Sequence, residues 1–189
     1  APLHVIACEN AIGGSAQLKE LVYAQLDENV RIKADASIAF PNAAVDRIVP
    51  LQQHEDILKV VVEPFYEWVV DSSQMIPGYA PIGGVHYVEN LDPYIERKLF
   101  TVNTGHCSAA YLGFLRGYET IQQVMADEEL TSLVREVLLE TGAVLVSKHG
   151  FDQVEHTKYI DKNLERFRNP SLTDEVSRVG RSPIRKLSP

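Results

Sequence analysis

The sequence lacks several features by which proteins are commonly classified. It has only two cysteines in 189 residues, Cys8 and Cys107, and they form no CxxC pair. A zinc cluster or a disulfide framework is therefore not expected, and a reducing cytoplasm is the simplest location. No apolar run approaches the roughly 20 residues of a membrane-spanning helix, and no signal peptide is visible. The sequence predicts a cytoplasmic protein without a membrane partner.

Basic residues are also scarce. Eighteen Lys and Arg stand against 26 Asp and Glu, for a formal net charge of −8. A nucleic-acid-binding surface needs clustered Lys and Arg, so this balance argues against that function. From Lys162 to the end, however, seven basic residues outnumber three acidic ones, so this segment carries +4 and the rest of the chain −12. One basic end on an acidic body indicates binding of a small anion.

Several catalytic and cofactor motifs are missing as well. The sequence contains no GxG, so it has neither a dinucleotide fingerprint nor a Walker loop. It also contains no GxSxG and no HExxH. His149, Asp152 and His156 are close in sequence but lie on both sides of a predicted helix break, so no metal site is expected.

The composition that remains, with 45% hydrophobic and 23% charged residues, is typical of a soluble globular protein. Its first half is predicted to be rich in strands. Residues 3–8 (LHVIAC) are nearly all apolar, as in a buried parallel strand, and Gly13 and Gly14 lead into a helix over 16–26. Further strands are predicted over 31–40, 57–62 and 67–70, and a loop rich in Pro and Gly over 76–84.

The second half is predicted to be helical. Asp92 and Pro93 open a helix through about residue 115. Asp127 starts a long helix that Gly150 ends, and Asp152 caps the next one. The predicted helices cover 92–115, 127–149, 152–167 and 173–179.

The best candidate for a chemical site lies in ERKLFTVNTGH, residues 96–106. On an ideal helix Asn103 lies about 140° and His106 about 80° from Lys98, so the three share one side. Burial lowers the pKa of a lysine toward the range that a general base needs, and an amide can donate to a developing alkoxide. The alternative is three ordinary polar side chains on a helix surface, and spacing alone does not exclude it.

Two further stretches have either a functional or a structural role, and the sequence does not decide which. Asn42 follows Pro41 at a predicted turn, where its side chain either faces a cleft or merely caps the turn. Near the end of the chain, the basic cluster is either a phosphate site or a solvated tail. Its members are Arg178, Arg181, Arg185 and Lys186.

Together these stretches resemble the polyol-specific long-chain dehydrogenases. The K-x4-N-x2-H pattern of Lys98, Asn103 and His106 carries the resemblance, and IACEN, AVDRIVP, AYLG, ETGAVLVSKHGFD and RVGRSPIRKLS occur in the family's order. The resemblance implies an α/β fold, in which the last part of a Rossmann-type sheet (residues 1–50) precedes a mainly helical substrate domain (51–189). It also implies interconversion of D-mannitol 1-phosphate and D-fructose 6-phosphate with NAD and without a metal.

The resemblance also implies roles for single residues. Lys98 would be the general base, Asn103 would polarise the substrate oxygen with help from Asn42, and His106 would orient the hydroxyl and the lysine. Glu9 and Asn10 would approach the nicotinamide, at the carboxyl end of a parallel strand. The sugar phosphate that the resemblance implies as the substrate matches the basic end, where Arg181 and Arg185 are the expected phosphate ligands.

Two alternatives remain beside this hypothesis. One is a related polyol or hexonate dehydrogenase that acts on an unphosphorylated substrate. The other is a non-catalytic helical binding module. Because the fingerprint loop is absent, we expect this chain to be an internal piece of the enzyme that alone binds NAD weakly and is inactive.

Overall fold

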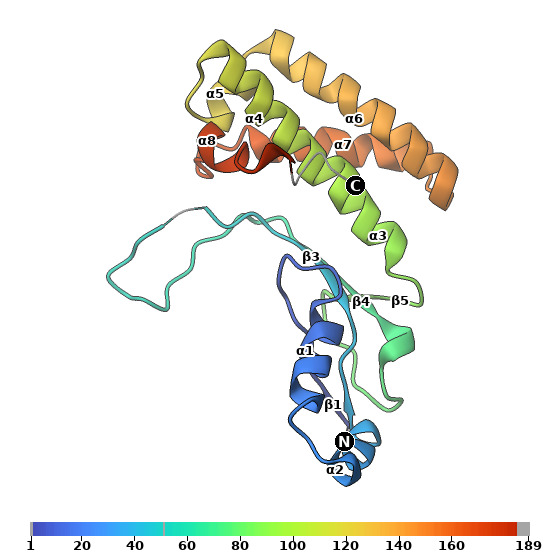
Figure 1. The fold of residues 1–189 in the computed structure, drawn as a ribbon. Coiled ribbons are helices and arrows are strands. Elements are labelled where there is room, and N and C mark those ends of the chain that lie inside the picture. Colours follow the sequence, from blue (N-terminus) through green and yellow to red (C-terminus); the bar gives the residue numbers. More distant parts are fainter. Residues whose placement is uncertain (1, 51, 185–189) are drawn as a thin grey trace. The chain divides into compact units, whose positions relative to one another are not determined.

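The structure, a computed structural model, describes residues 2–50 and 52–184, and the chain folds as two units (Figure 1). Unit 1 contains Ala1–Arg47 and Pro64–Ile95. Unit 2 contains Ile48–Glu63 and Glu96–Pro189.

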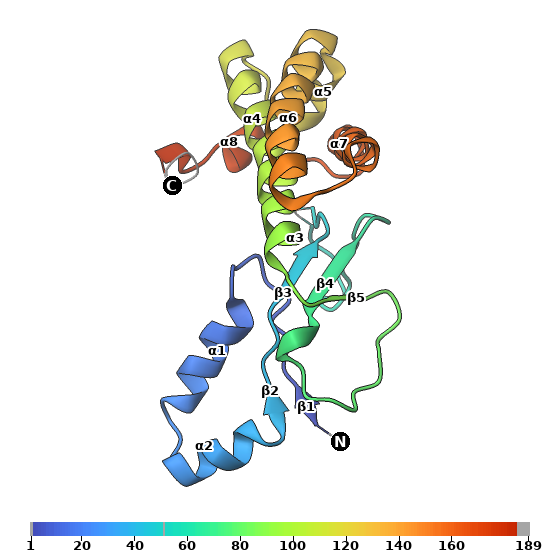
Figure 2. The same cartoon turned by 90° about the vertical axis from the view of Figure 1, so that its right-hand side faces the viewer.

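Unit 1 begins with a parallel strand pair, as the apolar run at the start predicts. β1 (Leu3–His4) pairs in parallel with β2 (Ile38–Ala39), although β1 is shorter than the apolar run. The helices α1 (Gly14–Tyr23) and α2 (Glu28–Asp35) form the connection between them (Figure 2). Gly13 has φ 68°, a left-handed conformation that only glycine adopts without strain, so it permits the turn into α1.

The prediction of a strand over residues 31–40 is wrong for most of that range. Residues 28–35 form α2, and only Ile38 and Ala39 are in a strand. The alternation in RIKADA has the period of a strand, but Arg, Lys and Ala are strong helix formers. Glu28 in the first turn and Lys33 in the last turn also favour the helix through its dipole.

A second sheet in unit 1 has three strands. The central strand, β4 (Glu67–Asp71), pairs antiparallel with β3 (Ala43–Asp46) and parallel with β5 (His86–Val88). Val69 and Val70 are fully buried in it. The prediction of a strand at 67–70 and of a loop at 76–84 is confirmed, whereas β5 was not predicted.

The strand predicted over 57–62 is not present. These residues lie in unit 2 without regular structure, and Ile57 is 91% exposed. No strand pairs with them. At Val61 the backbone hydrogen bonds go to the side chain of Gln52, whose amide donates to the Val61 carbonyl and accepts from the Val61 N–H. A row of apolar residues is not sufficient for a strand without a partner strand.

Unit 2 is otherwise helical, and its long helices begin and end close to the predicted residues. Asp127 and Asp152 cap α6 and α7, each accepting a backbone N–H, and Gly150 ends α6 in the left-handed conformation. The helices are α3 (Asp92–Arg97, which starts in unit 1), α4 (Thr104–Arg116), α5 (Ile121–Ala126), α6 (Glu128–His149), α7 (Gln153–Phe167) and α8 (Val176–Val179).

Two helices differ from the prediction. α5 was not predicted, although Thr120 and Gln123 form a capping box at its start. α8 begins at Val176 and not at Thr173, because the backbone before it pairs with the residues that precede α5. There the Ile121 N–H donates to the Asp174 carbonyl, at 2.9 Å.

The core of unit 2 lies where α4, α5, α6 and α7 meet, and α4 and α6 run side by side (Figures 1 and 2). Its apolar side chains come from each of these helices and from α8. They include Ala109, Val124, Val134, Leu138, Ile160, Phe167 and Val176, all of them nearly or fully buried. Of the apolar residues predicted to share one face of the long helix, Leu130, Val134, Leu138 and Leu145 are buried, whereas Leu133 and Val144 are exposed.

A buried ion pair holds the irregular segment 52–63 to α7. The Arg166 guanidinium donates to both carboxylate oxygens of Glu63, at 2.7 and 3.0 Å, and both side chains are at most 3% exposed. Arg166 also donates to Asn163, and Glu63 accepts the N–H of Ile48 at 2.5 Å. These hydrogen bonds compensate for the burial of two charges.

Candidate active site

The predicted catalytic residues lie on one continuous helical stretch, but its middle is not an α-helix. Residues 98–103 form a π-helical segment, η2 (Lys98–Asn103), between α3 and α4. The ideal α-helix assumed from the sequence is therefore wrong at this point. Lys98 opens the π segment and Asn103 closes it, while His106 lies in the first turn of α4. All three side chains are half-buried.

The π segment changes how these side chains are arranged. In a π-helix the hydrogen bonds join residues five positions apart, and the turn is wider than in an α-helix. Residues five apart therefore face more nearly the same way than the 140° expected for an α-helix. Lys98 and Asn103 are separated by five positions. The π segment thus brings the ammonium-bearing and amide-bearing residues to one side of the helix.

Two threonine hydroxyls hold the carbonyl groups of the π segment. Thr141 on α6 donates to the carbonyl of Phe100, at 2.8 Å, and Thr104 donates to that of Leu99, at 3.0 Å. A π segment strains the regular helical hydrogen bonding, and hydroxyl donors supply a replacement.

A glycine allows the helix to approach its neighbours closely beside this segment. A Cβ at Gly105 would lie 3.0 Å from Leu138 of α6 and 3.0 Å from Phe167 of α7. Any larger residue would push α4 away from both helices. Because Gly105 lies between Asn103 and His106, this close approach fixes the position of both polar side chains in unit 2.

His106 is held by an aromatic ring and by a carboxylate. Its imidazole stacks on Phe167, with ring centres 4.9 Å apart and planes only 6° from parallel. Its Nε2 lies 3.4 Å from Oδ2 of Asp174, whose side chain is 6% exposed. The histidine therefore has a fixed ring plane, and a carboxylate lies beside one of its nitrogens.

Asp174 is the main residue of this site that the sequence did not indicate. Its carboxylate also forms a two-point ion pair with Arg178, whose Nε lies 2.6 Å from Oδ1. The spacing of four on a predicted helix would have suggested that ion pair. No sequence signal links Asp174 to His106, which is 68 positions away and reached only through the packing of α4 against α8.

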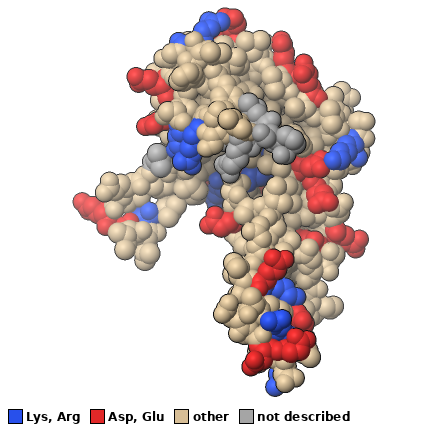
Figure 3. Space-filling view, in the orientation of Figure 1, with Lys and Arg blue, Asp and Glu red and all other residues tan. Residues whose placement is uncertain are grey.

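The structure describes only two residues of the basic cluster, Arg178 and Arg181. Arg178 is engaged by Asp174, Arg181 is exposed just after α8, and Arg185 and Lys186 lie outside the described residues. Among the described residues on the face seen in Figure 3, Lys and Arg are scattered among Asp and Glu and form no broad basic surface.

The remaining candidates lie in unit 1, at the carboxyl ends of the parallel pair. Glu9 and Asn10 are exposed and lie on the segment that follows β1. Asn42 follows β2, and its side-chain oxygen accepts the N–H of Ala16 at the start of α1, at 3.2 Å. Its backbone N–H donates to Gln74, at 2.8 Å. Both hydrogen bonds reach distant residues, so Asn42 links the end of β2 to α1 and to Gln74 and does not cap its own turn.

A polar cluster joins the end of α3 to the end of α6. The Glu96 carboxylate accepts from Lys148, at 2.8 and 2.9 Å, and lies 2.7 Å from Nε2 of His149. The hydrogen bonds from Lys148, and then those from His149, lower the pKa of Glu96 below its usual value. Glu96 therefore stays ionised and anchors the helix two residues before Lys98.

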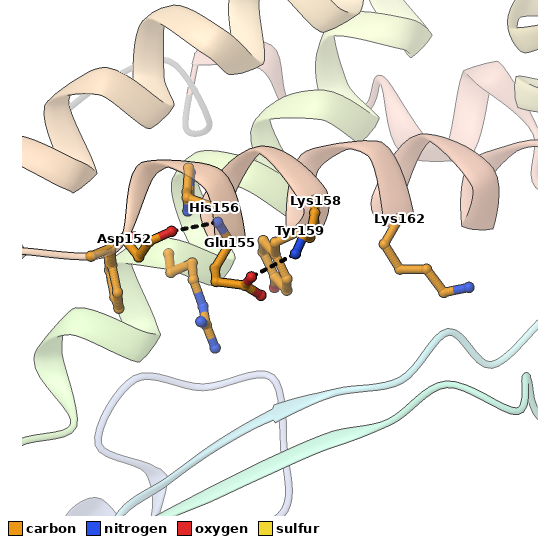
Figure 4. A pocket seen from close by; sticks show the side chains of 8 residues that line it. Asp152, Glu155, His156, Lys158, Tyr159 and Lys162 are labelled. Carbon is orange, nitrogen blue, oxygen red and sulfur yellow. Dashed lines mark hydrogen bonds and ion pairs between the residues drawn. The ribbon is translucent and has the colours of Figure 1, made fainter.

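One cavity in unit 2 is not lined by the candidate residues. It has a volume of about 330 Å³ and lies along α7 (Figure 4). Its charged groups are already engaged: Lys158 pairs with Glu155 at 2.7 Å, and the Arg97 guanidinium lies over the rings of Phe151 and Tyr159. The cavity is therefore separate from the Lys98, Asn103 and His106 group.

Two family models match most of the chain. The model described as the mannitol dehydrogenase Rossmann domain matches residues 1–83, and the mannitol dehydrogenase C-terminal domain matches residues 90–189. The chain belongs to the mannitol dehydrogenase family. The family resemblance and the predicted fold class, a Rossmann-type part followed by a mainly helical part, are thereby confirmed.

Individual mannitol dehydrogenase relatives are close in sequence. The chain is 60% identical over 187 residues to mannitol-1-phosphate 5-dehydrogenase of Brevibacillus brevis, covering 99% of this chain and 48% of that relative. It is 55% identical to mannitol-1-phosphate 5-dehydrogenase of Geobacillus stearothermophilus, covering 98% of this chain and 49% of the relative. The chain therefore spans about half the length of the curated relatives it matches.

Solved structures of this kind have the same fold. The substrate-free form of a D-sorbitol dehydrogenase superposes with a TM-score of 0.83 at 24% identity, over 97% of this chain and 41% of that one. A Pseudomonas fluorescens mannitol 2-dehydrogenase, solved with NAD and D-mannitol, gives a TM-score of 0.70 at 28% identity, over 93% and 39%.

No described helix is long and apolar enough to cross a bilayer. Within residues 2–50 and 52–184, no three His, Cys, Asp or Glu side chains are grouped as metal ligands.

Proposed function

We propose that the full-length protein containing this chain is an NAD-dependent dehydrogenase of the cytoplasm that interconverts D-mannitol 1-phosphate and D-fructose 6-phosphate without a metal. The observation that carries the proposal is the grouping of Lys98, Asn103 and His106 along one helical stretch by a π segment, in a chain of the mannitol dehydrogenase family. The relatives named mannitol-1-phosphate 5-dehydrogenase support the choice of substrate.

The chemistry follows from the residue types at this helix. Lys98, in its amine form, takes the hydroxyl proton of the alcohol while the carbon–hydrogen bond breaks and the carbonyl forms. The Asn103 amide donates a hydrogen bond to the same oxygen, where negative charge develops. His106, held against Phe167, orients the hydroxyl and the lysine. In the reverse direction Lys98 returns the proton to the ketone oxygen.

The residues of unit 1 fit a nicotinamide cofactor. Parallel strands bind such ligands at their carboxyl ends, and the segments after β1 and β2 both lie at that edge. Glu9 and Asn10 would hold the nicotinamide side, and Asn42 would assist Asn103. When bound, the cofactor supplies the acceptor for the hydride.

The basic end supports a phosphorylated substrate. Arg181 is exposed just after α8, the helix whose Arg178 pairs with the carboxylate beside His106. We assign Arg181 and Arg185 to the phosphate, because guanidinium groups bind phosphate oxygens in pairs.

The first experiment tests catalysis. NADH oxidation by the full-length enzyme is measured with fructose 6-phosphate, for the native protein, Lys98→Met and the control Lys158→Met. The control removes a charge from an exposed residue of α7 that pairs with Glu155. Loss of a general base is expected to lower kcat by about 10²–10⁴-fold, whereas the control keeps the native rate. A non-catalytic binding module would show no turnover in any of the three.

The second experiment tests the substrate class. Replacing Arg181 and Arg185 by Ala is expected to raise KM for fructose 6-phosphate by about tenfold or more, since each charge-assisted hydrogen bond contributes about 1.5–3 kcal/mol. KM for fructose should change little. Equal effects on the two sugars, or a native preference for fructose, would favour an unphosphorylated substrate, such as the D-mannitol in the mannitol 2-dehydrogenase structure.

A further inference from the structure

One aspartate of unit 2, Asp174, contacts three helices at the candidate site. Asp174 precedes α8, its Oδ2 lies 3.4 Å from Nε2 of His106 on α4, and its two oxygens pair with Arg178 on α8. The Asp174 N–H also lies 3.3 Å from the side-chain oxygen of Gln122 on α5. Its side chain is 6% exposed, so solvent screens these interactions little.

Both carboxylate oxygens of Asp174 pair with Arg178. A carboxylate can only accept hydrogen bonds. The contact between Nε2 of His106 and this carboxylate is favourable only when Nε2 carries a proton. A bare nitrogen there would put two sets of lone pairs 3.4 Å apart.

We propose that Asp174 is a positioning residue that fixes the tautomer of His106. A neutral imidazole has one N–H and one bare nitrogen, and the partner of one nitrogen decides the role of the other. With the proton on Nε2, the nitrogen that lies 3.4 Å from Oδ2 of Asp174, Nδ1 carries no proton and can only accept. The stack on Phe167 fixes the plane of the ring, so the carboxylate and the aromatic ring together set both its orientation and its proton.

The consequence for catalysis rests on the proposed function, in which His106 orients the substrate hydroxyl and Lys98. A ring with a bare Nδ1 accepts a hydrogen bond from the hydroxyl or the lysine. The other tautomer would offer a donor in the same place and oppose that role. Asp174 therefore acts through His106 and does not itself contact the reacting atoms.

The test reads the tautomer directly in the full-length protein. Labelling with ¹⁵N-histidine gives separate signals for protonated and bare ring nitrogens, and His106→Gln identifies the signals of this residue. At a pH where the ring is neutral, the native protein is expected to carry the proton on Nε2. In Asp174→Asn and Asp174→Ala the signals are expected to move toward a mixture of both tautomers. Glu175→Gln is the matched control, because Glu175 is the next residue, is exposed and contacts Ser177.

Kinetics of the same variants provide a second measurement. Asp174→Asn is expected to lower kcat with fructose 6-phosphate by about 10–100-fold, the cost known for metal-binding histidines that lose the group orienting them. KM should change less, and Glu175→Gln should keep the native values. Far-UV circular dichroism confirms that each variant is folded, and if the alanine variant is not, the asparagine variant decides.

A native proton on Nδ1, or a tautomer that is the same with and without the carboxylate, would overturn the inference. Absence of native activity on fructose 6-phosphate would instead overturn the proposed function. In that case the tautomer measurement would still decide the role of Asp174, so the two failures are distinguishable.

Discussion

Breaking the buried ion pair between Glu63 and Arg166 should strongly destabilise unit 2. Its side chains are 2% and 3% exposed, with nitrogen–oxygen distances of 2.7 and 3.0 Å. Replacing Arg166 by Met leaves the Glu63 carboxylate buried without its cation. Breaking such a pair typically costs about 3–5 kcal/mol. Because domains are stable by only about 5–15 kcal/mol, this single change should remove a large part of the stability.

The assay is urea unfolding of this chain, followed by far-UV circular dichroism. Arg166→Met should lower the free energy of unfolding by about 4 kcal/mol. The matched control is Lys162→Met on the same helix. Lys162 pairs with Glu165 at 3.2 Å, but the two side chains are 54% and 67% exposed. Such an exposed pair contributes less than about 1 kcal/mol, so the control should remain near the native value.

A double variant separates the charge pair from simple packing. When Glu63→Leu is combined with Arg166→Met, no buried charge remains, so the double variant should recover much of the stability lost by Arg166→Met alone. Additive losses in the two variants would refute this reasoning and show that packing, rather than an isolated charge, sets the cost. A loss below about 1 kcal/mol in Arg166→Met would refute it as well.

Two further predictions concern the packing of α4 and of α7. Gly105→Ala places a methyl group 3.0 Å from Leu138 and should lower the free energy of unfolding by about 1–3 kcal/mol. In contrast, Gly83→Ala, with nothing within 4 Å, should leave it nearly unchanged, and equal costs would contradict the packing argument. Burial lowers the pKa of His156 below 6.5, and the ring is 5% exposed. Its folded pKa therefore lies below its unfolded one, so stability is full above about pH 6.5 and falls as the pH drops below it. The midpoint of thermal unfolding should follow this dependence, and His156→Phe should flatten it; an equal slope in both proteins would refute the assignment.

Local chemistry in the sequence was enough to predict most of the helical half. Asp127 and Asp152 are followed by amphipathic runs, and Gly150 supplies the left-handed end, so the limits of α6 and α7 follow from caps that act over a few residues. Strands were harder to predict, because a strand needs a partner. Residues 57–62 have the composition of a strand without a neighbour to pair with, whereas 67–71 have two neighbours.

The candidate site also has features that follow from the sequence and features that depend on tertiary packing. The sequence by itself determined which residue types gather near 98–106, because Lys98, Asn103 and His106 lie within nine positions of one another. Only the tertiary structure decided that this stretch is a π-helix, since the Phe100 carbonyl is held by Thr141 of α6. It also decided that Asp174 faces His106, since that contact requires α8 to pack against α4. Periodicity reports only the neighbours along one element, and packing selects the neighbours that come from elsewhere in the chain.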